Sequence, residues 1–236
     1  MMNIKSNQHL KNDMTLSVVL PTYNEEENII LVITKLQSVL RGVCSFEILI
    51  VDDGSIDHTS YLVQEYAKMD RRIRLISHQK NMGYGSAVST GLRNSRGDFV
   101  FFSDSDGQFD FQELPHFLSL IQYSDIVVGY RLTRRDPFHR KLNSYLWTKL
   151  NNRYFRLGIR DLNCAFKLFR RSFVQSLKLD VQGASINAVI LTQARSQGLR
   201  IIQSPVSHYP RIGGTQTGAN PIVILRAIGE FIDQIT

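Results

Sequence analysis

Oxygen-bearing side chains alternate along the segment Asp104-Ser-Asp-Gly-Gln108. Two carboxylates and an amide oxygen at alternate positions can converge on a hard cation such as Mg²⁺ or Mn²⁺, which keeps open positions for substrate phosphates. The Asp-x-Asp spacing alone is a weak signal, because it arises by chance on the order of once in a chain of this length. Its position is a stronger signal, because it ends the apolar run Phe99–Ser103, which we expect to be a buried strand. The alternative is an acidic helix start that includes Asp110.

Two more acidic segments follow predicted strands. Tyr23-Asn-Glu25 comes after the run Leu16–Leu20, and Asp52-Asp53 comes after Phe46–Val51. Carboxylates at a nucleotide site typically accept hydrogen bonds from a ribose hydroxyl or a base N–H. Three acidic loops at one edge of a sheet repel one another unless a cation or hydrogen-bond donors lie among them. The pattern therefore favours ligand binding over coincidence.

Strands and helices alternate regularly over the first 130 residues. Short apolar runs alternate with segments whose apolar residues have helical spacing. This alternation predicts an α/β fold with a mostly parallel sheet, in which ligands bind beyond the carboxyl ends of the strands. Asn24 is the expected N-cap of the first helix. The expected strands are 16–20, 46–51, 73–77, 99–103 and 125–130, and the expected helices are 25–40, 57–69, 84–94 and 111–123.

The second half departs from this pattern but contains no linker. We therefore expect one domain over residues 16–236, made of the halves 16–130 and 131–236, after a flexible tail at 1–15. Helices are expected at 138–157, 185–195 and 221–235, and strands at 164–169 and 199–208.

Charge divides the chain at the same place. The first 130 residues carry 11 Lys/Arg against 16 Asp/Glu, and the remainder carries 17 against 5. This asymmetry predicts a cation-binding face joined to an anion-binding face. Residues 131–171 alone hold 12 Lys/Arg, a density typical of contact with phosphate, nucleic acid or an anionic membrane. The two distant cysteines, Cys44 and Cys164, indicate a reducing compartment rather than a disulfide framework.

Four segments occur in a characteristic order and spacing. They are Val19-Leu-Pro-Thr-Tyr-Asn-Glu25, Val51-Asp-Asp-Gly-Ser55, Asn81-Met-Gly-Tyr-Gly-Ser-Ala87 and Asp104-Ser-Asp-Gly-Gln108. Together they resemble glycosyltransferase family 2, and most closely its dolichyl- and polyprenyl-phosphate mannosyl- and glucosyltransferases, over residues 16–216. The resemblance implies a GT-A-type, Rossmann-like α/β fold and transfer with inversion. It also implies a nucleoside-diphosphate sugar donor, GDP-mannose or UDP-glucose, held through Mg²⁺ or Mn²⁺.

The resemblance assigns a role to each candidate residue. The expected nucleotide-sugar contacts are Pro21, Tyr23, Glu25, Val51, Asp53, Asp104, Ser105 and Arg131, and the expected metal ligands are Asp104, Asp106 and Gln108. Arg140, Lys167 and Arg211 are expected to hold the acceptor phosphate, and Asp106, Arg131, Asp161 and Arg211 to serve catalysis. Thr215-Gln216 stands where the family has Ser-Lys, which leaves that anion site one positive charge poorer.

The choice of acceptor follows from a shortage of carboxylates. A hydroxyl acceptor needs a base, and residues 181–229 contain no Asp or Glu, which leaves Asp161 as the one well-placed candidate. A phosphate is already an anion and needs only arginines to orient it. We therefore expect a dolichyl or polyprenyl phosphate acceptor. The alternative is a hydroxyl acceptor such as a glycan, with Asp161 as base.

Membrane contact is expected at the basic, aromatic segment 138–157. This composition suits an anionic membrane surface, unless the aromatic residues pack on the sheet and only the charges face water. Residues 1–15 lack the apolar run of a secretory signal, and no run of about 18 apolar residues predicts a transmembrane helix. We expect a cytoplasmic enzyme at the inner face of the membrane that takes part in cell-envelope glycan biosynthesis.

Other function classes fit less well. A nucleotidyltransferase normally needs a glycine-rich phosphate loop after the first strand, where this chain has Pro21-Thr-Tyr-Asn-Glu25. A non-catalytic scaffold has no need of Asp104, Asp106 and Gln108 together. Nucleic-acid binding rests on charge alone, and we do not expect it. The sugar, the nucleotide, the oligomeric state and the pathway stay open.

Overall fold

The computed structural model describes residues 14–132, 138–211 and 213. Strands and helices alternate over most of this length, as the apolar pattern predicts. The strands are β1 (Thr15–Thr22), β2 (Ser45–Asp52), β3 (Ile73–Ser77), β4 (Phe99–Ser103), β5 (Ile126–Arg131), β6 (Phe166–Arg170) and β7 (Ile201–Val206). The helices are α2 (Ile29–Leu40), α3 (Thr59–Met69), α4 (Tyr84–Asn94), α5 (Leu114–Leu120), α6 (Phe138–Phe155), α7 (Arg171–Ser176) and α8 (Ile186–Ser196), with 3₁₀ turns at Phe111–Glu113 and Ile121–Tyr123.

The described strands form one sheet in the order β3-β2-β1-β4-β6-β5-β7. Every pairing is parallel except those of β6, which runs antiparallel to both β4 and β5. The chain moves outward from β1 to β3 and then returns to place β4 on the other side of β1. The boundary between β1 and β4 is thus the point where strand order reverses, and ligands bind at such points in open α/β sheets.

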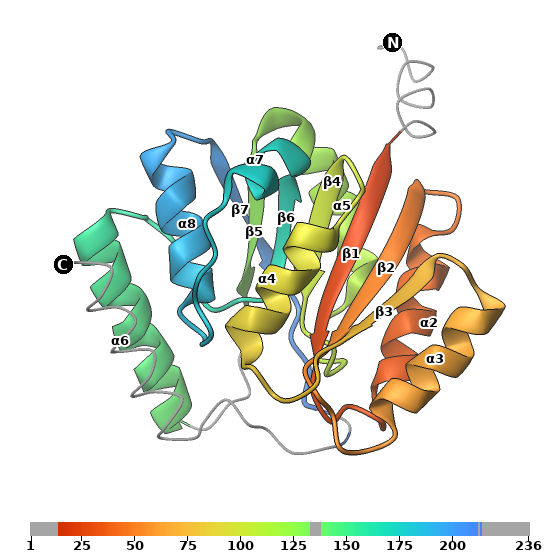
Figure 1. The fold of residues 1–236 in the computed structure, drawn as a ribbon. Helices are drawn as coiled ribbons and strands as arrows, with labels where there is room; N and C mark the ends of the chain where they lie inside the picture. Colours follow the sequence, from red (N-terminus) through yellow and green to blue (C-terminus); the bar gives the residue numbers. More distant parts are fainter. Residues whose placement is uncertain (1–13, 133–137, 212, 214–236) are drawn as a thin grey trace, which may run out of the picture.

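Helices cover both faces of this sheet (Figure 1). α4 packs on β1 and β2, across the face turned to the viewer in Figure 1. α2 packs with α3 and α5 on the other face, as right-handed crossovers in opposite directions require. α6 lies beside α8, outside the sheet. The carboxyl ends of the parallel strands point to the lower edge in Figure 1.

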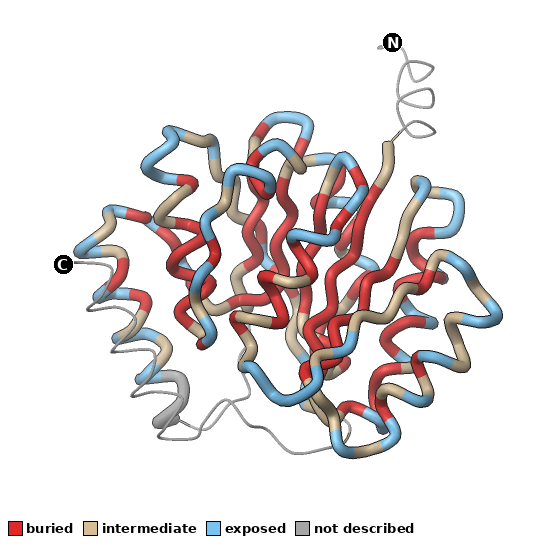
Figure 2. Tube along the Cα trace, viewed as in Figure 1, coloured by how far each residue is buried: buried red, intermediate tan, exposed pale blue. Residues whose placement is uncertain are grey.

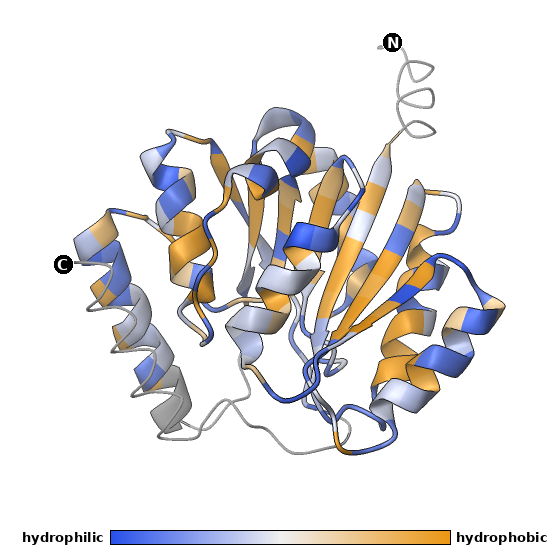
Figure 3. Cartoon of the chain, in the orientation of Figure 1, coloured by the Kyte–Doolittle hydropathy of each residue, from blue (hydrophilic) through white to orange (hydrophobic). Residues whose placement is uncertain are grey.

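The core lies along the central strands, which are both buried and apolar (Figures 2 and 3). Phe166 on β6 is the centre of an aromatic cluster. Its ring centroid lies 4.6 Å from that of Phe101 on β4, 4.7 Å from that of Phe117 on α5 and 5.5 Å from that of Phe109. Because Phe109 belongs to the loop that follows β4, this packing anchors the acidic loop to the core.

The start of α2 differs from the sequence prediction. α2 begins at Ile29, four residues later than predicted, and Asn24 is not its N-cap. Asn24 has a φ of 53°, in the left-handed region that Asn tolerates better than most residues. Its Oδ1 accepts a hydrogen bond from the backbone N–H of Ile56 (2.9 Å). Asn24 therefore connects two loops and does not begin a helix.

Other predicted elements fall close to their observed positions. α7 was not predicted, because six residues are too few to show a helical period. The antiparallel direction of β6 was also not predicted. The expected helix at 221–235 and residues 1–13 of the expected tail lie outside the described residues, and β1 already begins at Thr15.

Candidate functional site

Three loops follow β1, β2 and β4 at the same edge of the sheet, as the sequence predicts. They are residues 23–28, 53–58 and 104–110. A segment after β7 crosses this edge as well, because Phe109 and His208 form an isolated antiparallel bridge. The edge is thus built from four parts of the chain.

Asp104 follows β4 directly and is half-buried. The Tyr84 hydroxyl donates a hydrogen bond to its Oδ1 (2.8 Å). Burial raises the pKa of Asp104 to about 7, and the charge of Asp106 contributes to the rise. Tyr84, Arg131 and Lys167 oppose this rise. The two carboxylates therefore repel each other in a setting that solvates them poorly.

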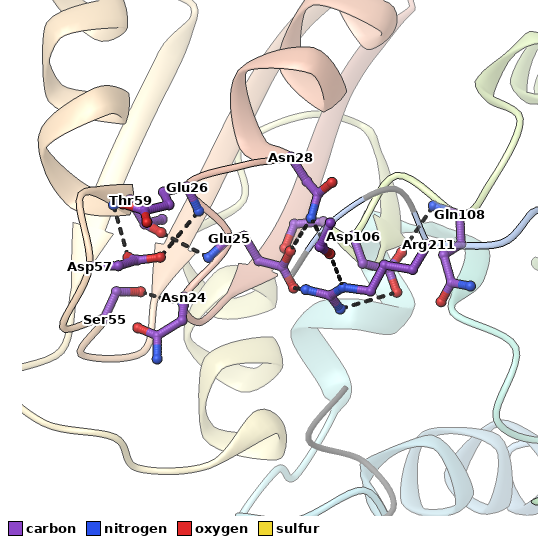
Figure 4. Close-up of polar contacts among 12 residues, drawn as sticks. Asn24, Glu25, Glu26, Asn28, Ser55, Asp57, Thr59, Asp106, Gln108 and Arg211 are labelled. Carbon is purple, nitrogen blue, oxygen red and sulfur yellow. Dashed lines mark hydrogen bonds and ion pairs between the residues drawn. The ribbon is translucent and has the colours of Figure 1, made fainter. Parts of the chain in front are cut away.

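Arg211 connects two of the acidic loops (Figure 4). Its Nη2 lies 2.6 Å from Oε1 of Glu25, and its Nη1 lies 4.0 Å from Oδ2 of Asp106. Asn28 Nδ2 donates to the other Glu25 oxygen (2.8 Å). Burial raises the pKa values of Glu25 and Asp106, and Arg211 opposes both shifts. The structure thus brings together a predicted nucleotide contact, a predicted metal ligand and a predicted acceptor contact.

The oxygen atoms at this edge fit a hard divalent cation. A cation between Asp104 and Asp106 would relieve the repulsion that raises the pKa of Asp104. Within the described ranges, no group of three or more His, Cys, Asp and Glu side chains could hold a metal ion. Mg²⁺ and Mn²⁺ suit such a site, because one or two carboxylates suffice when waters and phosphates complete the shell.

Gln108 has a different set of partners. Its side-chain Nε2 donates to the carbonyl of Tyr209 (2.8 Å), and its own carbonyl accepts from the Tyr209 N–H (2.8 Å). The backbone N–H of Gln108 also donates to Asp106 Oδ1 (3.1 Å). These contacts make Gln108 a clamp between the acidic loop and the segment after β7. Its role as a metal ligand stays a prediction.

The loops after β1 and β2 are joined by hydrogen bonds (Figure 4). The N–H of Asn24 donates to Ser55 Oγ (2.9 Å), and the N–H of Glu25 donates to Thr59 Oγ1 (2.8 Å). Because α3 begins at Thr59, these bonds fix Glu25 relative to a helix rather than to a loose loop.

Four other predicted nucleotide contacts lie near the loops that follow β1 and β2. Pro21 and Val51 are buried and stand opposite each other in the β1–β2 ladder. Ser105 is also buried, and its hydroxyl donates to the carbonyl of Pro21 (2.9 Å). Tyr23 is half-buried. Pro21, Val51 and Ser105 therefore join the acidic loop to β1 and β2.

Asp53 organises the loop between β3 and α4. Its carboxylate lies 2.7 Å from His78 Nδ1 and accepts from the N–H groups of Met82 (2.9 Å) and Gly83 (2.8 Å). His78 Nε2 lies 3.0 Å from Thr90 Oγ1 on α4. These contacts show Asp53 as the support of a loop. Its predicted contact with the nucleoside stays a prediction.

Arg131 and Asp161 form a bidentate ion pair. Arg131 Nε donates to Oδ2 (2.6 Å), and Nη2 donates to Oδ1 (2.8 Å). The side chains are 11% and 10% exposed, so water screens this pair weakly. Arg131 ends β5, at the same edge of the sheet as Asp104. Arg131 and Asp161 were both predicted as catalytic residues, and the structure places the two side chains in contact.

Lys167, predicted to contact the acceptor phosphate, is buried in the sheet. It lies on β6 with 0% exposure, and its Nζ donates to the carbonyls of Leu162 (3.1 Å) and Cys164 and to Asn187 Oδ1 (2.7 Å). An ammonium group has three protons, so these acceptors use all of its donors. Burial lowers its pKa to about 8. This arrangement argues against direct contact between Lys167 and an acceptor phosphate. The side chain of Arg140 lies outside the described residues.

Sequence reasoning missed three polar residues around these groups. His78 gave no signal, because a single histidine after a strand has no pattern. Tyr84 was predicted as the first residue of a helix and as part of the segment 81–87, but no role was assigned to its hydroxyl. Asn187 did have a signal, since it is a polar residue in the apolar run Ile186–Leu191. A buried polar residue on such a helix needs an internal partner.

A solved structure of similar fold places the chain in a structural class. The structure of glucosyl-3-phosphoglycerate synthase from Mycobacterium tuberculosis, in complex with Mn²⁺, uridine diphosphate and glucosyl-3-phosphoglycerate, matches with a TM-score of 0.68. The match covers 94% of this chain and 80% of that chain, at 22% sequence identity. The fold is therefore of the GT-A type, as the sequence resemblance implied.

Two curated relatives are similar in sequence. A dolichyl-phosphate beta-glucosyltransferase of Trichomonas vaginalis is 33% identical over 209 residues, which cover 81% of this chain and 64% of the relative. A dodecaprenyl-phosphate galacturonate synthase of Rhizobium johnstonii is 29% identical over 171 residues, which cover 70% of this chain and 51% of the relative. The chain thus aligns with between half and two thirds of the length of these relatives.

A family model also covers most of the sheet and the acidic edge. The model described as glycosyl transferase family 2 matches residues 17–178, which span β1 to α7 and include Asp53, Asp104, Asp106 and Arg131. With this match over more than half of its length, the chain belongs to glycosyl transferase family 2.

Proposed function

We propose that this protein transfers a hexose from a nucleoside-diphosphate sugar to a polyprenyl or dolichyl phosphate, with inversion at the anomeric carbon. The observation that carries the proposal is the pair Asp104 and Asp106 at the carboxyl end of β4, with Arg131 and Arg211 beside it. In the reaction, the bond between the anomeric carbon and the donor diphosphate breaks, and the diphosphate leaves with the electron pair. An oxygen of the acceptor phosphate forms the new bond to the same carbon.

The donor half of the proposal rests on the acidic loops. Asp104 and Asp106 would hold Mg²⁺ or Mn²⁺, which supplies positive charge to the departing diphosphate. Glu25, fixed by Thr59 and Arg211, lies beside Asp106 and is suited to a ribose hydroxyl or a base N–H. GDP-mannose and UDP-glucose are the donors that we propose to test first. The Mn²⁺ and uridine diphosphate in the solved mycobacterial complex support this choice.

The phosphate acceptor is supported by the state of Asp161. Both of its oxygens accept hydrogen bonds from Arg131, and this pairing stabilises the ionised carboxylate and makes it a weaker base. A phosphate acceptor needs no such base. Arg131 and Arg211, at the same edge as Asp104, supply guanidinium donors for phosphate oxygens. The two curated relatives are named for polyprenyl-type phosphates, which agrees with this acceptor class.

Membrane contact is proposed for the outer face of α6. The exposed residues Leu142, Leu146 and Leu150 follow one another at intervals of four, with Lys149 and Arg153 also exposed between and beyond them. Apolar side chains mixed with basic ones suit the interface of an anionic membrane, where long basic side chains reach the headgroups. In the described part of the chain, no helix has the length and apolarity to cross a bilayer.

The test of the proposal begins with the donor. UDP-glucose, GDP-mannose and their nucleoside diphosphates are added to the protein with and without Mn²⁺, and the melting temperature is measured. At a 100-fold excess over Kd, the correct donor is expected to raise the melting temperature by about 5 °C, and only when Mn²⁺ is present. Transfer to a short polyprenyl phosphate is then followed by chromatography of the lipid product.

Matched variants test the acidic pair. Asp104→Ala and Asp106→Ala are expected to abolish transfer while the protein stays folded. Asp110→Asn, in the same loop, is expected to retain activity, because Asp110 caps a 3₁₀ turn through its Oδ1 and Asn keeps that oxygen. Near-normal transfer by either alanine variant would remove the proposed metal site.

A hydroxyl acceptor is the second candidate, with Asp161 as base. It is tested by offering the dephosphorylated polyprenol beside the phosphate in the same assay. Transfer to the alcohol alone would contradict the phosphate acceptor while leaving the donor half intact.

A further inference from the structure

A chain of polar side chains joins a buried ammonium group to the acidic edge. Lys167 Nζ donates to Asn187 Oδ1 (2.7 Å). The side chain of Asn187 lies near the Tyr84 hydroxyl and partly opposes the rise in its pKa that burial causes, and the Tyr84 hydroxyl donates to Asp104 Oδ1 (2.8 Å). The four side chains come from β6, α8, α4 and the end of β4, so the chain spans elements that are far apart in sequence.

Chemistry fixes the direction of each hydrogen bond. A lysine ammonium can only donate, so Asn187 must present its carbonyl oxygen to Lys167. The amide nitrogen of Asn187 then faces the other way, toward Tyr84 Oη. The Tyr84 hydroxyl has one proton, and it donates that proton to Asp104. Because an ionised carboxylate can only accept, Tyr84 is the donor in this last bond.

Packing holds the members of this chain in place. The N–H of Gly85, next to Tyr84, donates to the carbonyl of Gln182 (2.8 Å), just before α8. A Cβ at position 85 would lie 2.5 Å from the carbonyl oxygen of Val181, so only glycine permits this approach of α4 to residues 181–183. The Tyr84 ring also packs near Phe102 of β4, with centroids 6.3 Å apart. The close approach brings Tyr84 within reach of both Asn187 and Asp104.

We infer that Lys167, Asn187 and Tyr84 are positioning residues, which hold Asp104 in a fixed orientation and leave its second oxygen for a divalent cation. This inference rests on the proposed function, because it requires that Asp104 binds a cation. It replaces the predicted contact of Lys167 with the acceptor by an indirect role. Groups that orient metal ligands through hydrogen bonds commonly affect metal affinity as strongly as 10–100-fold.

The main test removes one oxygen atom from the chain. Tyr84→Phe keeps the ring and deletes the hydroxyl, so it is expected to fold normally. Mn²⁺ binding is measured by the electron paramagnetic resonance signal of free Mn²⁺, in the presence of UDP and, separately, of GDP. We expect Tyr84→Phe to weaken Mn²⁺ binding by about 10-fold or more. The control is Tyr66→Phe, because the Tyr66 hydroxyl donates to Gln37 on the α2 side, away from Asp104.

A double variant tests whether the residues act as one chain. Lys167→Met keeps a similar volume and removes the ammonium group. If the chain transmits the orientation, Lys167→Met weakens Mn²⁺ binding, and adding it to Tyr84→Phe causes no further loss. Independent, additive losses would contradict the chain, as would a Tyr84→Phe variant that binds Mn²⁺ as tightly as the wild type. Wild-type protein that binds no Mn²⁺ with either nucleotide would contradict the proposed function, and the positioning role would fall with it.

Discussion

Arginine side chains at the acidic edge already have carboxylate partners within the protein. Arg211 pairs with Glu25, and Arg131 pairs with Asp161. A phosphate bound as proposed would therefore meet guanidinium groups whose positions are fixed but whose charge is partly neutralised. Because a guanidinium has five N–H donors, each arginine can hold its carboxylate and a phosphate oxygen at the same time. We expect these ion pairs to orient a bound phosphate more than to increase the affinity for it.

Asp161→Asn distinguishes support of Arg131 from general-base catalysis. Asn keeps one oxygen that can accept from Arg131, so we expect transfer to polyprenyl phosphate to fall less than 10-fold. A base that takes a proton from the acceptor typically contributes 10²–10⁴-fold, so a loss of that size would support the hydroxyl acceptor. The measurement is kcat at saturating donor, with the melting temperature as the control for folding.

The paired acids were predictable from sequence, and several of their partners were not. The spacing of Asp104 and Asp106, and their position after an apolar strand, indicate a ligand site. The partner of Asp53 is His78, which lies 25 residues away and has no periodic signal. The burial of Lys167 was also hidden, because its neighbours Phe166 and Leu168 predict a strand without showing that both of its faces are covered. Such contacts depend on the tertiary arrangement.

At the scale of elements, close backbone approaches determine where the site residues lie. α4 approaches residues 181–183 at Gly85, and β1 approaches the turn before β4 at Gly97, where a Cβ would lie 2.5 Å from the N atom of Ser17. Neither contact leaves room for a side chain. The glycines therefore set the position of α4 and the register of β4.

Gly85→Ala tests the first of these contacts. The added methyl group meets backbone atoms that cannot rotate away, so α4 must shift. We expect the free energy of unfolding to fall by about 2 kcal/mol, which urea denaturation measures. Ser86→Ala, on the next residue of α4, is the control and is expected to change the stability by less than about 0.5 kcal/mol. A Gly85→Ala protein as stable as the control would show that α4 can shift away from residues 181–183 at little cost in free energy.

A second junction joins α2, α3 and β3 through Asp70. Its carboxylate accepts hydrogen bonds from Arg72 and from Gln37 Nε2 (2.7 Å). Hydrogen bonds from Arg72 lower the pKa of Asp70 to about 2, from an ordinary value of 3.8. A lowered pKa stabilises the folded protein above pH 3.8, and this contribution disappears as the pH falls through 2.

We therefore expect Asp70→Asn to cost about 1 kcal/mol at pH 7, a figure that allows for solvent screening of the partly exposed pair. The cost is expected to shrink as the pH is lowered from 4 to 2. Urea denaturation of both proteins across this range measures it. Asp180→Asn, which alters a side chain that is 93% exposed, is expected to show no such dependence. An Asp70→Asn effect that stays constant down to pH 2 would contradict the assignment.

Element positions were largely predictable from sequence, and their ends and directions less so. The apolar runs located β1 to β5 within one or two residues at most ends, because parallel strands buried on both faces read as continuous apolar segments. The early part of α2 was misread, since acidic residues after an Asn look like a capped helix start. The antiparallel pairing of β6 leaves no mark in its sequence, because both of its faces are buried in either direction.

At the scale of the whole molecule, α6 carries a run of apolar side chains that face solvent. Leu142, Tyr145, Leu146, Leu150 and Tyr154 are each more than 40% exposed. Its buried side instead includes Thr148 and Asn151. The alternative, in which the aromatic residues of this segment pack on the sheet, is therefore wrong for Tyr145 and Tyr154, whereas Trp147 and Phe155 pack partly against the core.

The double variant Leu146→Ser/Leu150→Ser tests whether this face meets a membrane. Sedimentation with vesicles of anionic and neutral phospholipid is expected to show at least about 10-fold weaker binding to the anionic vesicles than for the wild type. Raising the salt concentration is expected to weaken wild-type binding as well, because Lys149 and Arg153 contribute by charge. Met69→Ser, at an exposed apolar residue on α3, is the control. Equal binding by all three proteins would exclude α6 as the contact.

The place of β6 in the sheet has a consequence for how the protein matures. β6 inserts between β4 and β5, both of which precede it in the chain. Until it is synthesised, β5 has no neighbour in the sheet and β4 has an edge of unpaired backbone groups. A nascent chain that stops before residue 170 therefore exposes an unpaired strand edge, a feature that favours aggregation. Lys167 lies on β6 itself, so its positive charge comes near Asp104 only after that insertion.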